Sequence, residues 1–334
     1  MTEQTAEPAL VRAWYAGAAW LWLLRPLELL YRLLTWLRRQ AFRVGLCTVY
    51  RAPVPVVVVG NITVGGTGKT PVVIALVEAL QARGLRPGVV SRGYGAASGA
   101  TFPHRVGATS RAEDCGDEPL LIYQRTGVPC VVAPDRPAAV RALLAAAPVD
   151  LVLCDDGLQH YALARDFEIA LLDAQRLLGN GFCLPAGPLR EPAARLRAVD
   201  WILYRGGNEP GTRVDYVTDG LLPLLDHGRA PPPAQGAAVH AIAGIGQPGQ
   251  FFASLEAMGY QVTGQGFADH HAFVADDFAG LGERPLIMTE KDAVKCRALA
   301  GQGGVGDNLW YLKISARLPA ALVNRVAALA RPEP

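Results

Sequence analysis

A glycine-rich stretch carries the clearest chemical signal in this sequence. Residues 60–71 read G-N-I-T-V-G-G-T-G-K-T-P, after a valine-rich run at 54–60 and before a predicted helix that reaches Arg83. Glycines let backbone N–H groups close around a phosphate, while Lys reaches the β- and γ-phosphates and a Thr hydroxyl ligates Mg²⁺. We therefore predict a nucleotide-phosphate site, with Lys69 and Thr70 in these roles. Its expected contacts are Thr63, Val64, Gly65, Gly66, Thr67, Gly68, Lys69 and Thr70.

One position departs from the usual phosphate-loop consensus, because Thr63 stands where a glycine is expected five residues before Gly68. The alternative is a glycine-rich turn with a chance lysine. The flanking strand and helix argue against it, and so does the scarcity of lysine, with four Lys against 28 Arg. The four are Lys69, Lys291, Lys295 and Lys313.

A second apolar run ends in carboxylates. Residues 149–154 read V-D-L-V-L-C and lead into Asp155 and Asp156. An apolar strand that ends in acids, downstream of a phosphate loop, is where this fold class places the acid that organises Mg²⁺. An Asp-Asp-Gly turn is also ordinary loop chemistry. The preceding phosphate loop favours the magnesium interpretation.

A second glycine pattern lies at Gly244–Gly249, with Asp269 twenty residues further on. It matches the dinucleotide-binding fingerprint on paper. Since the chain already has a better phosphate site, we favour a tight strand-to-helix turn in a second α/β domain. Residue chemistry alone does not rank the other polar clusters, which are 116–119, 189–192, 269–271 and 289–292 with Lys295.

The composition restricts what must position these groups. The chain has 334 residues, 51% of them hydrophobic and 19% charged, with a net charge of +2. This size and composition predict about two domains with their own cores and exclude a disordered chain. Near neutrality argues against nucleic-acid binding by bulk electrostatics. Six scattered Cys, without metal-ligand spacing, indicate reduced thiols in a cytosolic body.

The opening segment differs from the remainder. Residues 1–51 hold seven Arg against three Glu, together with four of the six Trp. The uncharged stretch 13–24 is shorter than the ~20 residues that a transmembrane helix needs. The acidic start, at Glu3 and Glu7, and the charges that follow Leu24 disfavour a cleaved signal peptide.

After Pro26 the pattern predicts an amphipathic helix with a basic face. Its polar positions are Glu28, Arg32, Thr35, Arg39 and Arg43, and its apolar positions are Leu27, Leu30, Tyr31, Leu34, Leu37 and Phe42. Basic residues beside Trp, Tyr and Leu are typical of a helix that lies in a membrane interface. The alternative is a helix packed on the protein's own core.

Taken together, these motifs resemble the tetraacyldisaccharide 4'-kinase family, which phosphorylates lipid A precursors. The resemblance covers nearly the whole chain, and Thr63 belongs to that family's own variant of the loop. Its further motifs are S-R-G-Y at 91–94, G-D-E-P at 116–119, D-D-G-L-Q-H at 155–160, L-P-A-G-P-L-R-E at 184–191, A-G-I-G-Q-P at 243–248, F-A-D-H at 267–270 and T-E-K-D-A-V-K at 289–295.

The resemblance implies transfer of the ATP γ-phosphate to the 4'-hydroxyl of a tetraacylated glucosamine disaccharide 1-phosphate, at the cytoplasmic face of a bacterial inner membrane. It implies that Asp117 and His270 activate the sugar hydroxyl, with His271 as a competing histidine. The other implied roles are a Mg²⁺ shell of Thr70, Asp155, Asp156 and Glu118, transfer assisted by Lys69 and Arg190, and substrate contacts from His160, Arg190 and Asn61.

We therefore expect an α/β protein with three parts: an interfacial helix at 1–45, a P-loop kinase domain at 46–215, and a smaller α/β domain at 216–334 that closes the substrate cleft. Its last helix could return to the first domain. ATP, Mg²⁺, the acylated disaccharide and inner-membrane lipids are the expected ligands, without a nucleic-acid partner or an obligate protein partner. One rival is a GTPase-like switch or metallochaperone, although no Asn precedes a Lys as guanine recognition by N-K-x-D requires. The other is a nicotinamide-dependent enzyme.

Overall fold

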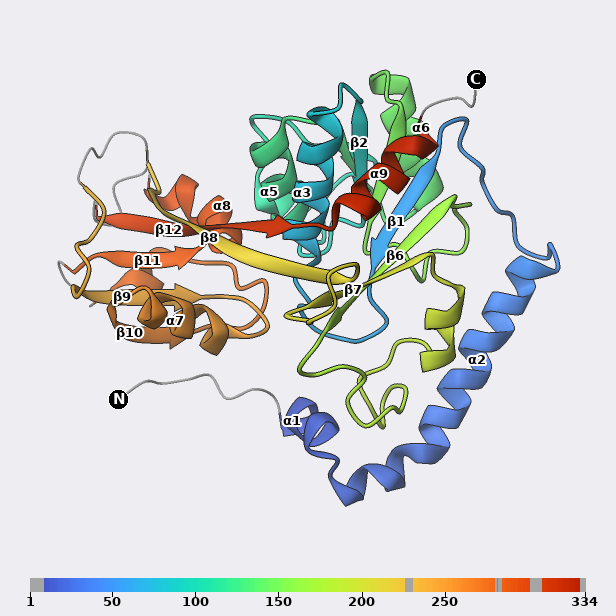
Figure 1. Cartoon of the computed structure of the whole chain (residues 1–334), viewed down its shortest axis with the longest axis horizontal. Helices are drawn as coiled ribbons and strands as arrows, with labels where there is room; N and C mark the ends of the chain where they lie inside the picture. The colour runs from blue at the N-terminus through green and yellow to red at the C-terminus, as the bar shows by residue number, and fades with distance from the viewer. Residues whose placement is uncertain (1–8, 226–230, 280, 282–283, 301–307, 331–334) are drawn as a thin grey trace.

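The computed structural model describes residues 9–225, 231–279, 281, 284–300 and 308–330. Its strands are β1 (Val56–Gly60), β2 (Pro87–Ser91), β3 (His104–Arg105), β4 (Cys130–Val132), β5 (Leu151–Asp155), β6 (Phe167–Asp173), β7 (Trp201–Arg205), β8 (Arg213–Pro223), β9 (Ala238–Ala243), β10 (Gln261–Gly266), β11 (Leu286–Thr289) and β12 (Leu309–Arg317). They form one continuous sheet in the order β10-β9-β11-β12-β8-β7-β6-β1-β5-β2-β4-β3. Figure 1 shows the two halves of this sheet side by side.

The first half is built around β1, which pairs in parallel with β5 on one side and β6 on the other. Its valines alternate, so that Val57 and Val59 join one core and Val56 and Val58 join the other. Burial on both faces explains the continuous valine run. The helices of this half are α3 (Lys69–Gln81), α4 (Ala112–Cys115), α5 (Asp117–Thr126), α6 (Arg136–Ala146) and the 3-10 helix η2 (Ala193–Ala198).

The second half is joined to the first through β8, which pairs in parallel with β7 and antiparallel with β12. Strands β9, β10, β11 and β12 then pair in parallel, with a separate core on each face. Its helices are α7 (Pro248–Ala257), the 3-10 helix η3 (Ala275–Phe278) and α8 (Glu290–Ala300). The predicted boundary between residues 215 and 216 falls within β8, and the division into domains stays a prediction.

The last described helix, α9 (Ala320–Leu329), returns to the first half of the sheet (Figure 1). Its residues Leu322 and Val326 are fully buried in the core that contains α3 and α5. The chain therefore crosses from the second half back to the first after β12, and this second crossing ties the halves together.

The N-terminal segment forms α1 (Ala9–Ala16), the 3-10 helix η1 (Ala19–Leu24) and α2 (Arg25–Arg43). Figure 1 shows α2 running along the outside of the first half, away from the sheet. Residues 1–8 of the predicted segment, including Glu3 and Glu7, lie outside the described residues, as do 226–230, 280, 282–283, 301–307 and 331–334 of the predicted second domain.

Helix α2 turns Glu28, Tyr31 and Phe42 toward the protein and its leucines outward. Glu28 is only 1% exposed, whereas Leu34 is 57% exposed. The alternative of a helix packed on the protein's own core is therefore wrong for the leucines, although Tyr31 and Phe42 of the predicted apolar positions do pack on the protein. The exposed apolar side chains are Trp20, Trp22, Leu23, Leu27, Leu29, Leu30, Leu33, Leu34, Trp36 and Leu37. None of the helices in the described ranges is both long enough and apolar enough to cross a bilayer.

Candidate active site

The glycine-rich loop connects β1 to the first residue of α3, which is Lys69. Gly68 has a φ of +85°, in the left-handed region, and an added Cβ would lie 2.5 Å from the Tyr216 hydroxyl oxygen. That hydroxyl donates a hydrogen bond of 2.5 Å to the Gly68 carbonyl oxygen. Glycine is therefore required here both by the backbone conformation and by the close approach of β8.

Asn61 lies at the centre of the polar groups around the loop and is fully buried. Its side-chain oxygen accepts hydrogen bonds from Lys69 Nζ at 3.3 Å and from the Arg190 guanidinium. Arg190 also donates to both carboxylate oxygens of Asp156, at 3.1 and 3.2 Å, and Lys69 Nζ lies 3.5 Å from Asp156. The structure thus brings together four residues from three motifs, Asn61 and Lys69 from the phosphate loop, Asp156 and Arg190.

The predicted phosphate contacts also include buried hydroxyl groups. Thr63, Thr67 and Thr70 are each less than 9% exposed. Thr67 Oγ1 is buried and has no hydrogen-bond partner among the described residues. A buried hydroxyl without a partner is costly. A phosphate oxygen in the loop could satisfy it.

The two carboxylates after β5 have opposite electrostatic environments. Burial alone would raise the pKa of Asp156, but Lys69 and Arg190 outweigh it and lower the pKa to about 2. Burial and the neighbouring Glu118 carboxylate raise the pKa of Asp155. Asp155 Oδ1 has no hydrogen-bond partner among the described residues. Asp156 is therefore a neutralised carboxylate, whereas Asp155 lacks the positive partner that its burial demands.

His160 follows these carboxylates on the same loop. Burial and the cations of Arg136 and Arg92 lower its pKa to about 3, so the imidazole is neutral near pH 7. Its neighbour Gln159 donates to the Asn61 carbonyl oxygen at 3.2 Å and accepts from Arg190 at 3.2 Å. The loop after β5 therefore braces the phosphate loop.

Asp117 and His270 meet although they are 153 positions apart in sequence. His270 Nδ1 lies 3.0 Å from Asp117 Oδ1 and 3.1 Å from Oδ2. Asp117 is only 3% exposed, and burial would raise its pKa, but the His270 hydrogen bond and the Lys291 ammonium outweigh this effect and lower the pKa. His270 has a φ of +61°, an uncommon conformation for a non-glycine residue that recurs at functional sites.

The contact with Lys291 indicates which ring nitrogen of His270 carries the proton. Its Nζ lies 3.3 Å from His270 Nε2, 3.2 Å from Glu118 and 3.2 Å from Asp269. Because an ammonium group only donates, His270 Nε2 must accept, and the ring proton lies on Nδ1 and points to Asp117. Burial would lower the pKa of Lys291, but the Glu118, Asp117 and Asp269 carboxylates raise it.

His271 belongs to a different pair. Its Nε2 lies 2.9 Å from Asp277 Oδ2, and its ring stacks on Phe267 with centroids 4.6 Å apart. Of the two adjacent histidines, His270 is thus the one in contact with Asp117. The chemical roles of both Asp117 and His270 remain predictions.

The T-E-K-D motif joins the two halves of the chain. Glu290 accepts hydrogen bonds of 2.9 and 2.8 Å from Arg125 of α5, and Asp292 accepts one from the Gly244 backbone nitrogen at 3.0 Å. Lys295 forms an ion pair with Asp292 at 2.8 Å. This motif orients α8 so that Lys291 reaches Asp117 and His270.

The Gly244–Gly249 turn faces the phosphate loop from the second half. It connects β9 to α7, as the strand-to-helix interpretation predicts. An ideal Cβ at Gly246 would lie 3.4 Å from the Gly66 nitrogen and 3.6 Å from Asp269 Oδ2. The turn therefore places the His270 segment next to the tip of the phosphate loop.

Sequence reasoning missed several of these residues. Lys291 stands in a noted motif with two of the four lysines, and the rarity of lysine was the available signal. Tyr94 also contacts the pair, since its ring centroid lies 4.7 Å from that of His270. No local sequence pattern predicts the role of Tyr216, because Tyr216 and Gly68 are 148 positions apart in the sequence.

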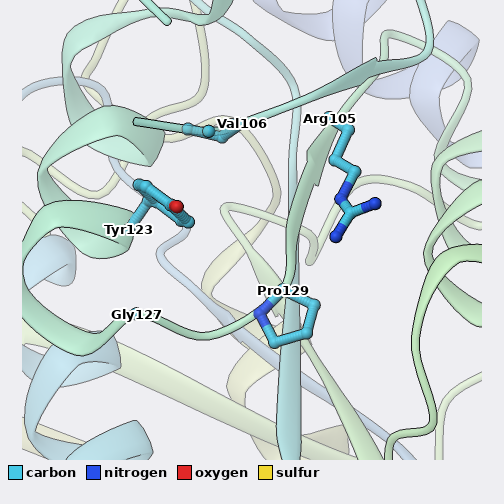
Figure 2. Close-up of a pocket in the computed structure, with 6 residues that line it drawn as sticks. Arg105, Val106, Tyr123, Gly127 and Pro129 are labelled. Atoms are coloured by element: carbon cyan, nitrogen blue, oxygen red, sulfur yellow. The ribbon is translucent and has the colours of Figure 1, made fainter. Parts of the chain in front are cut away.

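Two cavities contain none of the predicted site residues. One, of about 280 Å³, is lined by Arg105, Val106, Gly107, Tyr123, Gly127 and Pro129. Figure 2 shows Val106 and Tyr123 on one side and Arg105 on the other. Another, of about 400 Å³, includes Asp173, Arg205 and Gln250. Neither contains a predicted site residue.

A phosphate loop on the central strand of a parallel sheet, with acids at the end of the neighbouring strand, defines a P-loop nucleotide-binding protein of the α/β class. A family model described as Tetraacyldisaccharide-1-P 4'-kinase matches residues 20–331. The chain belongs to this family.

Individual relatives agree. The chain is 53% identical to Tetraacyldisaccharide 4'-kinase of Azotobacter vinelandii, over 96% of this chain and 97% of that protein. It is 52% identical to the Aeromonas salmonicida protein of the same name, over 94% of each. A crystal structure of LpxK from Aquifex aeolicus in complex with ATP is similar with a TM-score of 0.73 and 25% identity, over 93% of this chain and 99% of that chain. The predicted α/β fold is confirmed.

Replacing Lys69 tests the phosphate loop. We expect Lys69→Ala to reduce phosphate transfer by about a thousandfold or more, because the variant lacks the ammonium group that is predicted to meet the phosphates. The melting temperature should change little. Lys313→Ala, which removes a half-exposed lysine paired with Asp219, is the matched control and should keep the activity. Full turnover by Lys69→Ala would show that the phosphate loop is not part of the active site.

Proposed function

We propose that this chain transfers the γ-phosphate of ATP to the 4'-hydroxyl of a tetraacylated glucosamine disaccharide 1-phosphate. Membership of the tetraacyldisaccharide 4'-kinase family supports this activity. The observation that carries the assignment of residues is the buried Asp117–His270 pair. Gly246 lies close to Gly66 of the phosphate loop and to Asp269, which precedes His270.

On the phosphate side, the residues position ATP and neutralise charge. Phosphoryl transfer needs little covalent help from the protein, so positioning and electrostatics dominate. Lys69 and Arg190 share Asn61 and Asp156 as partners, which holds the two cations side by side. We assign both to the transferring phosphate, with Asn61 and His160 at the substrate edge.

On the acceptor side, Asp117 accepts the proton of the sugar hydroxyl. Its lowered pKa keeps it ionised near neutral pH, and the His270 Nδ1 proton fixes its orientation. A carboxylate held by a histidine follows the general pattern of a base with an orienting partner. As the hydroxyl oxygen forms its bond to the γ-phosphorus, its proton moves to an Asp117 oxygen, and the bond between the γ-phosphorus and the bridging oxygen of ATP breaks, so that ADP leaves.

The residues present also fit a magnesium ion. Asp155 offers a buried oxygen without a partner among the described residues, and burial and the Glu118 carboxylate raise its pKa, so a bound cation would favour its ionised form. In the part of the chain that is described, no three His, Cys, Asp or Glu side chains form a metal site on their own. Mg²⁺ commonly uses one or two carboxylates with water and substrate phosphates. Asp155 and Thr70, with Asp156 and Glu118, would hold it, and it would supply charge neutralisation on the phosphates.

We further propose that α2 docks the protein on the cytoplasmic face of the bacterial inner membrane. Leucine and tryptophan side chains are exposed along this helix, and exposed apolar patches of this kind mark contact surfaces. Arginines at its margins, such as Arg32 and Arg38, would meet anionic headgroups. A peripheral position of this kind brings the kinase to a lipid acceptor that stays in the bilayer.

The assay that tests the function uses radiolabelled nucleotide and the disaccharide lipid in detergent micelles. We expect label to appear on the lipid with ATP and far less with GTP, because no N-K-x-D guanine-recognition segment is present in the sequence. A strong preference for GTP would favour the GTPase-like alternative. Absence of labelled lipid with either nucleotide would contradict the proposal.

Removing the proposed base gives a second prediction. Asp117→Ala should lower kcat by about 10²- to 10⁴-fold while the affinity for ATP is largely kept. Asp277→Ala is the matched control, since it breaks the other Asp–His pair of the same region and should keep kcat. A raised KM with an unchanged kcat would contradict the assignment.

The membrane surface gives a third prediction. Combining Leu30→Ser with Leu34→Ser should weaken binding to anionic phospholipid vesicles at least about tenfold, since each buried leucine contributes about 2 kcal/mol. Vesicle sedimentation measures the effect. Leu222→Ser, an exposed leucine of β8, should bind like the unaltered chain. Equal binding by all three proteins would exclude α2 as the docking surface.

A further inference from the structure

Three hydrogen bonds join the N-terminal segment to the loop that carries Arg190. Trp14 Nε1 donates to the Pro185 carbonyl oxygen at 3.0 Å. The Cys183 backbone nitrogen donates to Glu28 Oε1 at 3.2 Å. The Tyr31 hydroxyl donates to the Arg190 carbonyl oxygen at 2.8 Å. These are specific polar contacts, so α1 and α2 do more than expose an apolar surface.

The first two contacts lie in buried surroundings. Glu28 is 1% exposed and is also paired with Arg25 at 2.9 Å. Trp14 is 5% exposed and lies in a small core with Leu21, against which Leu184 packs. A buried carboxylate or indole nitrogen without its partner is destabilised. The first part of the loop is thus held firmly against the N-terminal segment.

On its other side, the same loop is hydrogen-bonded to the beginning of the phosphate loop. The Arg190 backbone nitrogen donates to Ile62 O at 2.7 Å, and Val64 N donates to Pro188 O at 2.8 Å. Arg190 Nε donates to Thr63 O at 3.1 Å. Residues 182–191 therefore lie between α2 and the phosphate loop, in contact with both.

A second path reaches the same region from the end of α2. Phe42 packs against Tyr161, with ring centroids 6.1 Å apart, and the Arg39 guanidinium lies 5.9 Å from the same ring. The Tyr161 hydroxyl donates to Glu191, which follows Arg190. Both ends of residues 182–191 are therefore supported by α2.

We propose that Tyr31 is a positioning residue for phosphate transfer: its hydroxyl fixes the backbone of Arg190 and thereby the guanidinium that meets the transferring phosphate. This rests on the proposed kinase function. The side of α2 that carries Tyr31 then supports the active site, whereas its exposed leucines contact the membrane. The helix that docks the protein also holds a group needed for transfer.

The test compares Tyr31→Phe with Tyr260→Phe. Both changes remove one hydroxyl that donates to a backbone carbonyl oxygen, and Tyr260 lies in the second half, bonded to Pro233 O at 3.1 Å. We expect Tyr31→Phe to lower kcat about 3- to 10-fold, the effect of one hydrogen bond, with the KM for ATP unchanged. Tyr260→Phe should leave kcat unchanged.

Hydrogen exchange of the full-length variant supplies a readout that does not depend on activity. The Leu184, Leu189 and Arg190 amides are hydrogen-bonded within or beside the loop and should exchange several-fold faster in Tyr31→Phe. The β1 amides should not change. If the wild-type protein transfers phosphate but Tyr31→Phe shows neither a lower kcat nor faster exchange, this inference is wrong and the proposed function stands. Absence of wild-type transfer would overturn the proposed function and with it the role of Tyr31 in transfer, whereas faster exchange in Tyr31→Phe would still show that Tyr31 holds the Arg190 loop.

Discussion

The contact between Asp117 and His270 is the interaction on which the arrangement of the site depends. A buried carboxylate is unfavourable unless it is paired, and the cationic and imidazole partners of Asp117 among the described residues are His270, Lys291 and Lys295, all from the second half of the chain. The first half therefore cannot bury Asp117 favourably by itself. Asp117 is in α5, and Lys291 and Lys295 are in α8. The Arg125–Glu290 ion pair also joins α5 to α8.

The adjacent carboxylates of Asp155 and Asp156 lie in different electrostatic surroundings. Asp156 is held ionised by two cations, whereas Asp155 is buried with an oxygen that no described group satisfies. Such a separation of environments is how one site assigns different tasks to the same side chain. In the proposed function, Asp156 aligns Lys69 and Arg190 at the edge of the magnesium site, and Asp155 would be the main carboxylate ligand of the ion.

Local patterns predicted the parts of the site that adjoin one another in sequence. The phosphate loop, the strand before it and the Asp155–Asp156 turn were all visible, because strand, turn and helix signals act over a few residues. The Asp117–His270 pair came only from the family resemblance, since no local rule links positions so far apart. Periodicity predicts the exposed leucine face of α2 but assigns Tyr31 and Phe42 to it, although both contact the protein. It could not tell which face meets the protein, because that depends on loop 182–191.

We propose that Asp117 and His270 act as one unit. A double-mutant cycle on kcat measures this directly, with Asp117→Ala, His270→Ala and the combined variant assayed on the same lipid acceptor. We expect strong non-additivity, in which the double variant is hardly slower than Asp117→Ala alone, because the histidine acts through the carboxylate. Rate losses that simply multiply would show two independent residues and would contradict it.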